Sequence, residues 1–354
     1  MINEQFSFFG KFTIALHASV PSAILAYFKE EYTHHPYEAE RILPRISLVE
    51  VVEKIVIPQD SSVLIDQTLY YQGESIYFVQ EGFHLSIVMA RDCYVLCVEE
   101  GFDPFTLFYL HEVLMRYYAT AFGLLFLHAS AFSYQGACYV INAFGGTGKT
   151  NLLLDILERG GEYLADDLTV VDQNGVIYPY RKRINLLYYN FHYKPLLLKK
   201  TRVSQWRLKL LMKIQASKHS AFLYRFLLFR IEWRLRRVID QKVDYRLLYP
   251  SCSVAKLPDT THFIWLERTE AKTGFFEVER GYLLPRLKLC LALENRTFLD
   301  FDGYFSLVSS DFSYYQKRQS KMIDALLVAY EFSGVKKQTG DEQGLFHLID
   351  SFTK

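Results

Sequence analysis

The residues with the clearest chemical potential form one short run, AFGGTGKT, at positions 143–150. Its small residues let backbone N–H groups point inward at phosphate oxygens, while a lysine and a hydroxyl can reach the outer phosphates and a Mg²⁺ ion. The run follows an apolar segment typical of a strand and precedes one typical of a helix, whose N-terminus favours anions. The alternative is a glycine-rich turn without a ligand. We predict a phosphate loop whose nucleotide-binding residues are Gly145, Gly146, Thr147, Gly148, Lys149 and Thr150.

Ala143 stands where the usual pattern has its first glycine. We regard this as a modest departure, because the stricter demand for close backbone approach falls on Gly148.

Two adjacent carboxylates, Asp166 and Asp167, follow the predicted loop and helix. A helix of about ten residues runs ~15 Å away from the loop. A strand over 162–166 returns a similar distance at ~3.3 Å per residue. In a right-handed crossover both strands end at the same edge, so the pair is expected beside the loop. Such carboxylates suit Mg²⁺ binding and proton acceptance from a hydroxyl, although an exposed strand end is the alternative.

His128 is a third candidate, because it lies on the strand that precedes the strand of the phosphate loop. If these two strands pair, the histidine reaches the same edge of the sheet. On position alone, however, a histidine between Leu127 and Ala129 is more often a core residue with satisfied hydrogen bonds.

The whole chain must supply the elements that hold these residues. It has 354 residues, of which 50% are hydrophobic and 22% are charged, so it can bury a core and is not disordered. The formal charge of +1 excludes a wholly basic nucleic-acid coat. The five cysteines form no CxxC pair and are expected to be reduced. We see neither a signal-peptide pattern nor a transmembrane run and expect a soluble, cytoplasmic protein.

The order of apolar runs predicts an α/β fold, with a mixed sheet around the phosphate loop. Residues 1–104 are predicted to form an α+β N-terminal domain, 105–333 the nucleotide-binding domain and 334–354 a polar tail. Strands are expected at 51–57, 68–72, 75–79, 85–90, 93–98, 124–132, 137–144, 162–172, 261–267 and 274–279, the first five as an antiparallel meander. Helices are expected at 103–118, 151–160, 283–293 and 318–332, with Gly160 capping the second.

Residues 194–246 differ in composition, with fifteen basic residues against three acidic ones. We interpret them as a basic helical insertion, in which Arg202, Trp206, Lys209 and Lys213 share one side of a helical wheel. Two interpretations of this segment are open: a face of solvated cations, and a docking surface for an acidic peptide or protein. Contact with a membrane surface is less favoured, and a nucleic-acid partner is not expected.

At these residues the sequence resembles the HPr kinase/phosphorylase family, which shares a nucleotide-binding core with phosphoenolpyruvate carboxykinases. The matching features are Leu127-His128, GGTGKT, Arg159-Gly160 and Leu164-Ala165-Asp166-Asp167. The resemblance implies that Asp167 is the base and that His128 supports it or the transferred phosphate. It further implies that Lys149 neutralises the outer phosphates, while Thr150 and Asp166 hold Mg²⁺. Which carboxylate is the base stays open.

The sequence departs from the family downstream of the aspartate pair. The family's glycine-rich signature has no counterpart there, and YPYRKR (178–183) stands in its place. Arg181 or Arg183 could clamp a phosphate, and a solvated basic turn is equally compatible. The front section also differs from the family's usual N-terminal domain. The chain is therefore similar to related kinases that phosphorylate a hydroxyl of a ribosomal peptide precursor, such as those of lasso-peptide clusters.

The favoured function is ATP-dependent, Mg²⁺-assisted phosphorylation of a hydroxyl, with Ser or Thr of a peptide or protein as the acceptor. The substrate would dock on residues 194–246, and a homo-oligomer is compatible with these features. The alternatives are a nucleotide-binding regulator or assembly protein without catalysis, and a small-molecule kinase.

Overall fold

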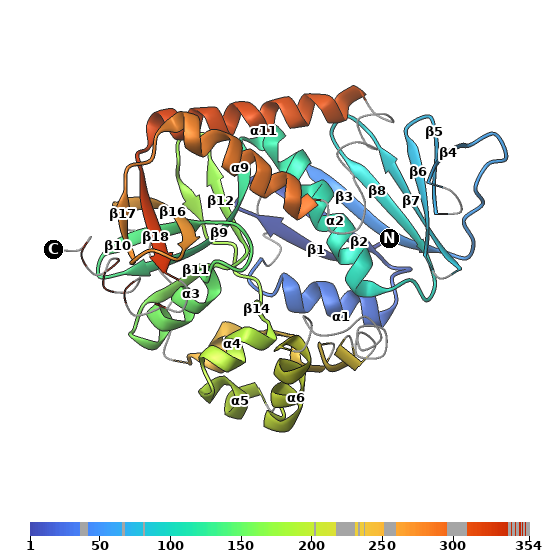
Figure 1. Cartoon of the computed structure of the whole chain (residues 1–354). Helices are drawn as coiled ribbons and strands as arrows, with labels where there is room; N and C mark the ends of the chain where they lie inside the picture. Colours follow the sequence, from blue (N-terminus) through green and yellow to red (C-terminus); the bar gives the residue numbers. More distant parts are fainter. Residues whose placement is uncertain are drawn as a thin grey trace. The chain divides into compact units, whose positions relative to one another are not determined.

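A computed structural model describes most of the chain. The described residues are 1–35, 42–65, 68–80, 82–201, 203–216, 231–232, 234–236, 238–250, 260–295, 310–338, 341, 344, 347, 349 and 351. They form two compact units (Figure 1). The first comprises Met1–His128, Val170–Tyr178 and Glu279–Glu331, and the second Ala129–Thr169, Pro179–Val278 and Phe332–Lys354. Together they are mixed α/β with large mixed sheets, as the sequence predicts.

The sheet of the first unit has the strand order β1-β2-β3-β8-β7-β6-β5-β4. Its strands are β1 (Ile2–Phe8), β2 (Phe12–His17), β3 (Arg45–Val52), β4 (Ser62–Ile65), β5 (Leu69–Gln72), β6 (Ser75–Gln80), β7 (Phe83–Met89) and β8 (Tyr94–Glu99). The meander from β5 to β8 is antiparallel, as predicted. The strand expected at 51–57 is wrong, because β3 ends at Val52 and runs parallel to β8. Beyond it, the Ile55 N–H donates to the side-chain carboxylate of Glu99 and not to the backbone of a neighbouring strand.

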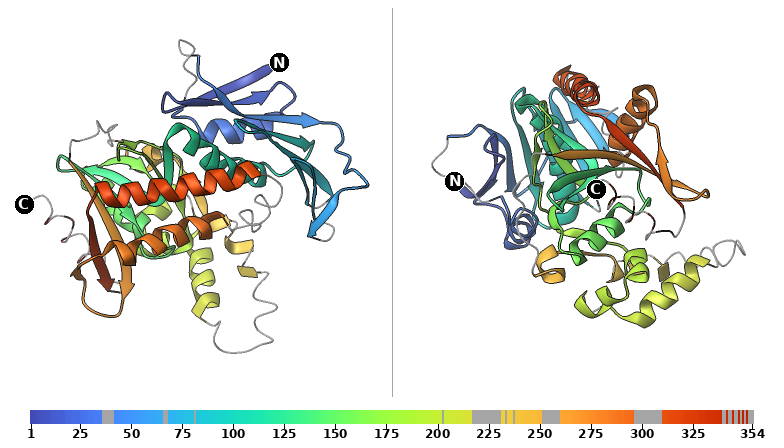
Figure 2. Two further views of the ribbon diagram at one scale, coloured as in Figure 1. Left: turned by 90° about the horizontal axis from the view of Figure 1, so that it is seen from above. Right: turned by 90° about the vertical axis from the view of Figure 1, so that its left-hand side faces the viewer.

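Helices cover this unit where the sequence places long apolar runs. They are α1 (Ser22–Glu31), α2 (Pro104–Ala119), the short 3₁₀ helix η1 (Thr120–Phe122), α9 (Arg280–Asn295) and α11 (Ser310–Ala329). Asp103 caps α2 by accepting from the Thr106 N–H at 2.8 Å. Helices α9 and α11 pack on each other, as Figures 1 and 2 show.

The second unit is built on a mixed sheet in which β12, β9, β10, β16, β18 and β17 are neighbours in that order, with β11 also paired to β9. The strands are β9 (Leu124–Tyr134), β10 (Ala137–Asn142), β11 (Glu162–Ala165), β12 (Leu168–Asp172), β16 (Thr261–Thr269), β17 (Gly274–Phe276) and β18 (Phe332–Gln338). The division between the units falls within β9 and β12, and β12 pairs with β13 (Ile177–Tyr178) in the first unit. Because β18 runs to Gln338, residues 334–338 belong to the sheet and not to a polar tail.

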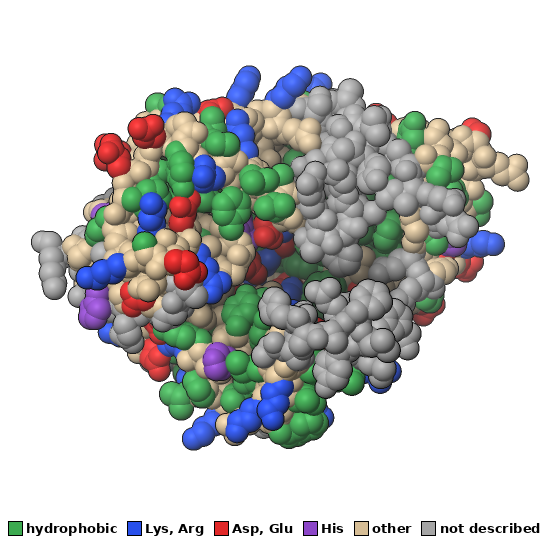
Figure 3. Space-filling view, in the orientation of Figure 1, with side chains coloured by type: hydrophobic (Ala, Val, Ile, Leu, Met, Phe, Trp, Pro, Cys, Tyr) green, Lys and Arg blue, Asp and Glu red, His purple; other side chains and the backbone are tan. Residues whose placement is uncertain are grey.

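The basic segment (residues 194–246) contributes α5 (Leu196–Thr201), α6 (Gln205–Ala216), β15 (Gln241–Val243) and the start of α8 (Tyr245–Leu248) to the second unit. It is preceded by β14 (Ile184–Leu186) and α4 (Tyr188–Tyr193). Leu208 and Leu211 of α6 are buried, whereas Trp206 is 63% exposed. Figure 3 shows basic and hydrophobic side chains together at its lower edge, where α5 and α6 lie in this view. Arg202, expected on the same face, lies outside the described residues.

No helix in the described part of the chain is long and apolar enough to cross a membrane.

Candidate functional site

The glycine-rich loop (residues 143–150) connects β10 to α3 (Lys149–Glu158), as the sequence predicts. Gly146 and Gly148 adopt positive φ angles of 77° and 106°, which glycine tolerates without strain. Behind the loop, α3 packs its leucine and isoleucine side chains into the core of the second unit, which includes Ile141 of β10. A rigid strand and a buried helix therefore hold both ends of the loop.

Lys149 folds back over this loop. Its Nζ donates to the carbonyl of Ala143 at 2.8 Å and to that of Phe144 at 3.4 Å, and the side chain is buried. The Thr147 hydroxyl donates to the same Phe144 carbonyl at 2.9 Å. The ammonium group is thus held at the loop, within reach of an anion that the loop would bind.

Asp166 and Asp167 reach the loop by the route expected from the crossover. Strands β10 and β11 are both antiparallel to β9 and lie on its two sides, so they are parallel to each other. The single strand predicted for 162–172 is wrong, because it is interrupted at the aspartate pair. There the Leu168 N–H donates to the Asp166 carbonyl at 2.8 Å, and Asp167 has a φ of 63°. This tight turn is strained for a residue other than glycine. Because of the turn, the backbone at the aspartate pair does not have regular strand geometry.

The Asp166 carboxylate lies directly beside the start of α3. Its Oδ1 accepts from the Ser130 hydroxyl at 2.7 Å and lies 3.3 Å from the Thr150 Oγ1. Burial and then the charge of Asp167 raise the pKa of Asp166 to about 7, although Ser130 and Lys149 oppose this shift. Ser130 is not among the site residues expected from the sequence, where its one signal is its position two residues after His128 on the same strand.

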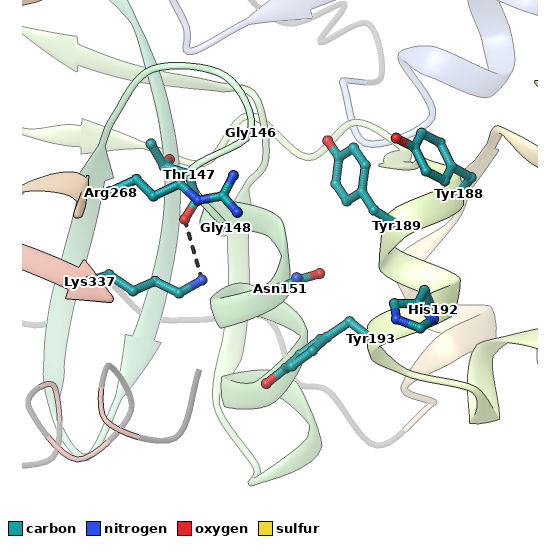
Figure 4. Close-up of a pocket in the computed structure, with 10 residues that line it drawn as sticks. All are labelled: Gly146, Thr147, Gly148, Asn151, Tyr188, Tyr189, His192, Tyr193, Arg268 and Lys337. Carbon is teal, nitrogen blue, oxygen red and sulfur yellow. Dashed lines mark hydrogen bonds between the residues drawn. The ribbon is translucent and has the colours of Figure 1, made fainter. Parts of the chain in front are cut away.

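A pocket of about 620 Å³ adjoins the loop (Figure 4). Its walls come from the loop, α3, α4, β16 and β18, through Gly146, Thr147, Gly148, Asn151, Tyr188, Tyr189, His192, Tyr193, Arg268 and Lys337. Of these residues, the sequence predicts only Gly146, Thr147 and Gly148. The others come from segments far along the chain, and no local motif marks them.

Helix α4 forms the aromatic wall of this pocket and is tied to α3. The Asn190 side-chain amide donates to Asn151 at 2.7 Å, and the Tyr193 hydroxyl donates to Asp155 at 2.9 Å. Burial, followed by the charges of Asp167 and Asp166, raises the pKa of Tyr189 to about 12. Tyr189 is therefore a neutral hydroxyl within electrostatic range of the aspartate pair.

Arg181 and Arg183, the predicted phosphate clamp, belong to a segment that lies next to Asp166, and they do not line the pocket. An isolated parallel bridge joins Ala165 to Tyr180, so Arg181 and Asp166 are the next residues along the two segments. The Tyr163 hydroxyl donates to the Lys182 carbonyl at 3.0 Å and anchors this segment. Arg181 and Arg183 are both half-buried. Their role as a clamp stays a prediction.

His128 belongs to the first unit, and its imidazole contacts α9. Its Nδ1 lies 3.1 Å from Oε1 of Glu294, and the ring is buried. Ala129, the next residue on β9, donates its N–H to the Asp167 carbonyl at 3.2 Å. Glu294 is not expected from the sequence, because it is far from His128 along the chain.

The donor set beside α3 fits a hard divalent cation. The Thr150 hydroxyl and the Asp166 carboxylate supply adjacent oxygen ligands of the kind that Mg²⁺ prefers, and a cation would offset the two neighbouring carboxylates. Within the described ranges, no three His, Cys, Asp or Glu side chains converge on a point where they could hold a metal. Mg²⁺ would therefore take its other ligands from phosphate oxygens and water, as is usual at phosphoryl-transfer sites.

No protein-family model matches this sequence, and no curated protein does.

Proposed function

We propose that this protein is a kinase with an HPr kinase-like nucleotide-binding core, which transfers the terminal phosphate of ATP to a hydroxyl. The acceptor that we favour is a serine or threonine of a peptide or protein. The observation that carries the proposal is that Lys149, Thr150 and the Asp166 carboxylate lie together at the glycine-rich loop and the start of α3, with Asp167 next along the chain. Phosphoryl transfer depends mainly on positioning and charge neutralisation, and these groups are of the kinds that it uses.

The roles of the side chains follow from their surroundings. The loop N–H groups and Lys149 would bind the phosphate chain, while Thr150 and Asp166 would hold Mg²⁺. The bound ion supplies neutralisation of phosphate charge. Asp166 has oxygen atoms already engaged with Ser130 and Thr150, whereas Asp167 occupies the tip of the tight turn. We therefore assign to Asp167 the task of accepting the proton from the attacking hydroxyl.

The basic helices support a peptide or protein acceptor over a small molecule. Exposed Trp206 and Leu210 are one helical turn apart on α6, and exposed Lys209 and Lys213 are similarly spaced. A mixed apolar and cationic face of this kind suits an acidic peptide segment. A small metabolite would make no use of it.

The first experiment is thermal unfolding with and without Mg²⁺ and ATP, for the wild type and Lys149→Ala. ATP at 100 times its dissociation constant should stabilise the wild type by about 2.7 kcal/mol, which corresponds to a shift of a few degrees. The shift should be much smaller in Lys149→Ala and unchanged in Lys11→Ala, a control at an exposed lysine of the first unit. Absence of a shift in the wild type would contradict the proposal.

The second experiment measures transfer of label from [γ-³²P]ATP to Ser- and Thr-containing peptides, with and without acidic flanking residues. Label on the hydroxyl, dependent on Lys149 and Asp167, is the expected result. Nucleotide binding without transfer to any acceptor and without ADP formation would instead indicate a nucleotide-binding regulator.

A further inference from the structure

Arg268 and Lys337 are an unusual pair, because they place two positive charges opposite each other in the sheet. Strands β16 and β18 are parallel, and their register sets Arg268 directly against Lys337. Both side chains line the pocket at the glycine-rich loop (Figure 4). Like charges in this relationship repel each other, so the arrangement costs stability unless negative charge lies nearby.

Lys337 is also deeply buried for a lysine. Its side chain is 4% exposed, and Nζ donates to the Thr147 carbonyl of the loop at 3.4 Å. Burial of an ammonium group carries a desolvation cost, so buried lysines are found mainly where their charge has a functional role. With Lys149, three cationic side chains surround a single glycine-rich loop.

Among the described residues, the Asp341 carboxylate interacts with Lys337. Lys337 contributes to lowering the pKa of Asp341, after larger effects from the Thr273 hydroxyl and the Gly344 N–H. Asp341 also accepts two hydrogen bonds outside the pocket. Arg268 and Lys337 bring two cationic groups to the pocket wall beside Thr147, an arrangement that suits an anion with more than one charge.

We propose that Arg268 and Lys337 bind the two inner phosphates of a nucleoside di- or triphosphate, an inference that rests on the proposed function. For transfer, the terminal phosphate must lie beside Thr150 and Asp166. The rest of the phosphate chain then crosses the loop N–H groups toward Thr147, where the two cations meet the α- and β-phosphates. The base accordingly lies on the β16–β18 side of the loop, and the hydroxyl acceptor approaches from the side of Asp167 and Tyr189.

The test is calorimetric titration of ATP and ADP, without any acceptor, into the wild type, Lys337→Gln and Arg268→Gln. Each substitution should lower the affinity for ATP and the affinity for ADP by the same factor, about 10- to 100-fold, because the two nucleotides share the inner phosphates. Lys336→Gln is the matched control. It removes the same charge from the neighbouring residue of β18, whose side chain is exposed and lies over the ring of Phe276. This control should leave both affinities within about twofold of the wild type.

The outcomes separate this inference from the kinase proposal. If the wild type binds both nucleotides and neither substitution weakens them, the inference is wrong and the kinase proposal stands. A loss of affinity for ATP without a loss of affinity for ADP would also overturn the inference, because the cations would then contact the terminal phosphate. If the wild type binds neither nucleotide, both proposals fall. A melting curve for each variant shows whether it is folded, and Arg268→Gln carries the test should Lys337→Gln not fold.

Discussion

Thr150 Oγ1 lies 3.3 Å from Asp166 Oδ1, although the two residues are sixteen positions apart in the chain. Helix α3 leads the chain away from the loop, and β11 returns it to the same edge of the sheet on the far side of β9. The tight turn at Asp167 then stops the strand where the Asp166 carboxylate lies beside the start of the helix. This relationship joins the proposed Mg²⁺ ligands to the proposed base.

Asp167→Asn should abolish phosphate transfer and leave nucleotide affinity within a few-fold of the wild type. Asparagine tolerates the positive φ of 63° at this position about as well as aspartate does, so the turn should survive. What is lost is the ability to accept a proton. Single-turnover transfer from labelled ATP and calorimetric binding of ATP measure the two quantities separately. Transfer at a near wild-type rate would exclude Asp167 as the base.

Asp166→Asn should stabilise the protein at pH 8 in the absence of divalent cations. Because burial and Asp167 raise the pKa of Asp166 from 3.8 to about 7, the folded state holds this proton more tightly than the unfolded state. The stability contributed by this group is complete below pH 4 and is lost as the pH rises through 7. The variant lacks this loss, so its advantage over the wild type should grow by roughly 3 kcal/mol between pH 4.5 and pH 8. Urea unfolding of both proteins at pH 4.5 and 8 checks this; an advantage that does not change with pH contradicts it.

Gly148→Ala should destabilise the protein by about 1–3 kcal/mol, whereas Gly145→Ala should change stability by less than about 0.5 kcal/mol. Gly148 has a φ of 106°, which an alanine adopts only with strain. Gly145 lacks a positive φ, and a Cβ added there meets no atom within 4 Å. Free energies of unfolding in urea, measured without nucleotide, give the comparison. Equal losses of unfolding free energy in the two variants would show that the positive φ of Gly148 does not matter for stability.

His111 should make the first unit sensitive to acid. Burial lowers the pKa of this histidine from 6.5 to about 3, so the unfolded state takes up the proton first as the pH falls. Above pH 6.5 the histidine is neutral in both the folded and the unfolded state, and its burial carries no titration cost. As the pH falls from 6.5 toward 3, the unfolded state binds the proton and the free energy of unfolding decreases. At pH 5 the loss is about 2 kcal/mol relative to pH 8.

The matched variant is His111→Gln, which does not titrate and can keep a polar atom near the Tyr32 hydroxyl, 3.4 Å from the histidine Nδ1. The difference in unfolding free energy between the wild type and this variant should change by about 2 kcal/mol between pH 8 and pH 5. Parallel pH profiles would show that His111 does not titrate between the folded and unfolded states.

Local features of the site and much of the fold could be predicted because their signals are contained in short segments. The glycine-rich loop lies between an apolar strand and a helix that ends before Gly160, whose φ is 88°. The meander from β5 to β8 follows from turn residues between alternating apolar runs. The approach of Asp166 to Thr150 follows from the handedness of one crossover.

Only the tertiary structure decided which distant segments complete the pocket. The opposition of Arg268 to Lys337 depends on the register of two strands between which the described chain forms β17, α9 and α11, and the polar composition of residues 334–338 does not indicate a strand. The tyrosine wall of α4 and the contact of Ser130 with Asp166 are likewise side-chain encounters without a local pattern. Sequence spacing determines backbone conformation over one or two elements, because the interactions that favour those elements are local. The partners of a side chain across a sheet depend on packing and register, which the whole chain sets together.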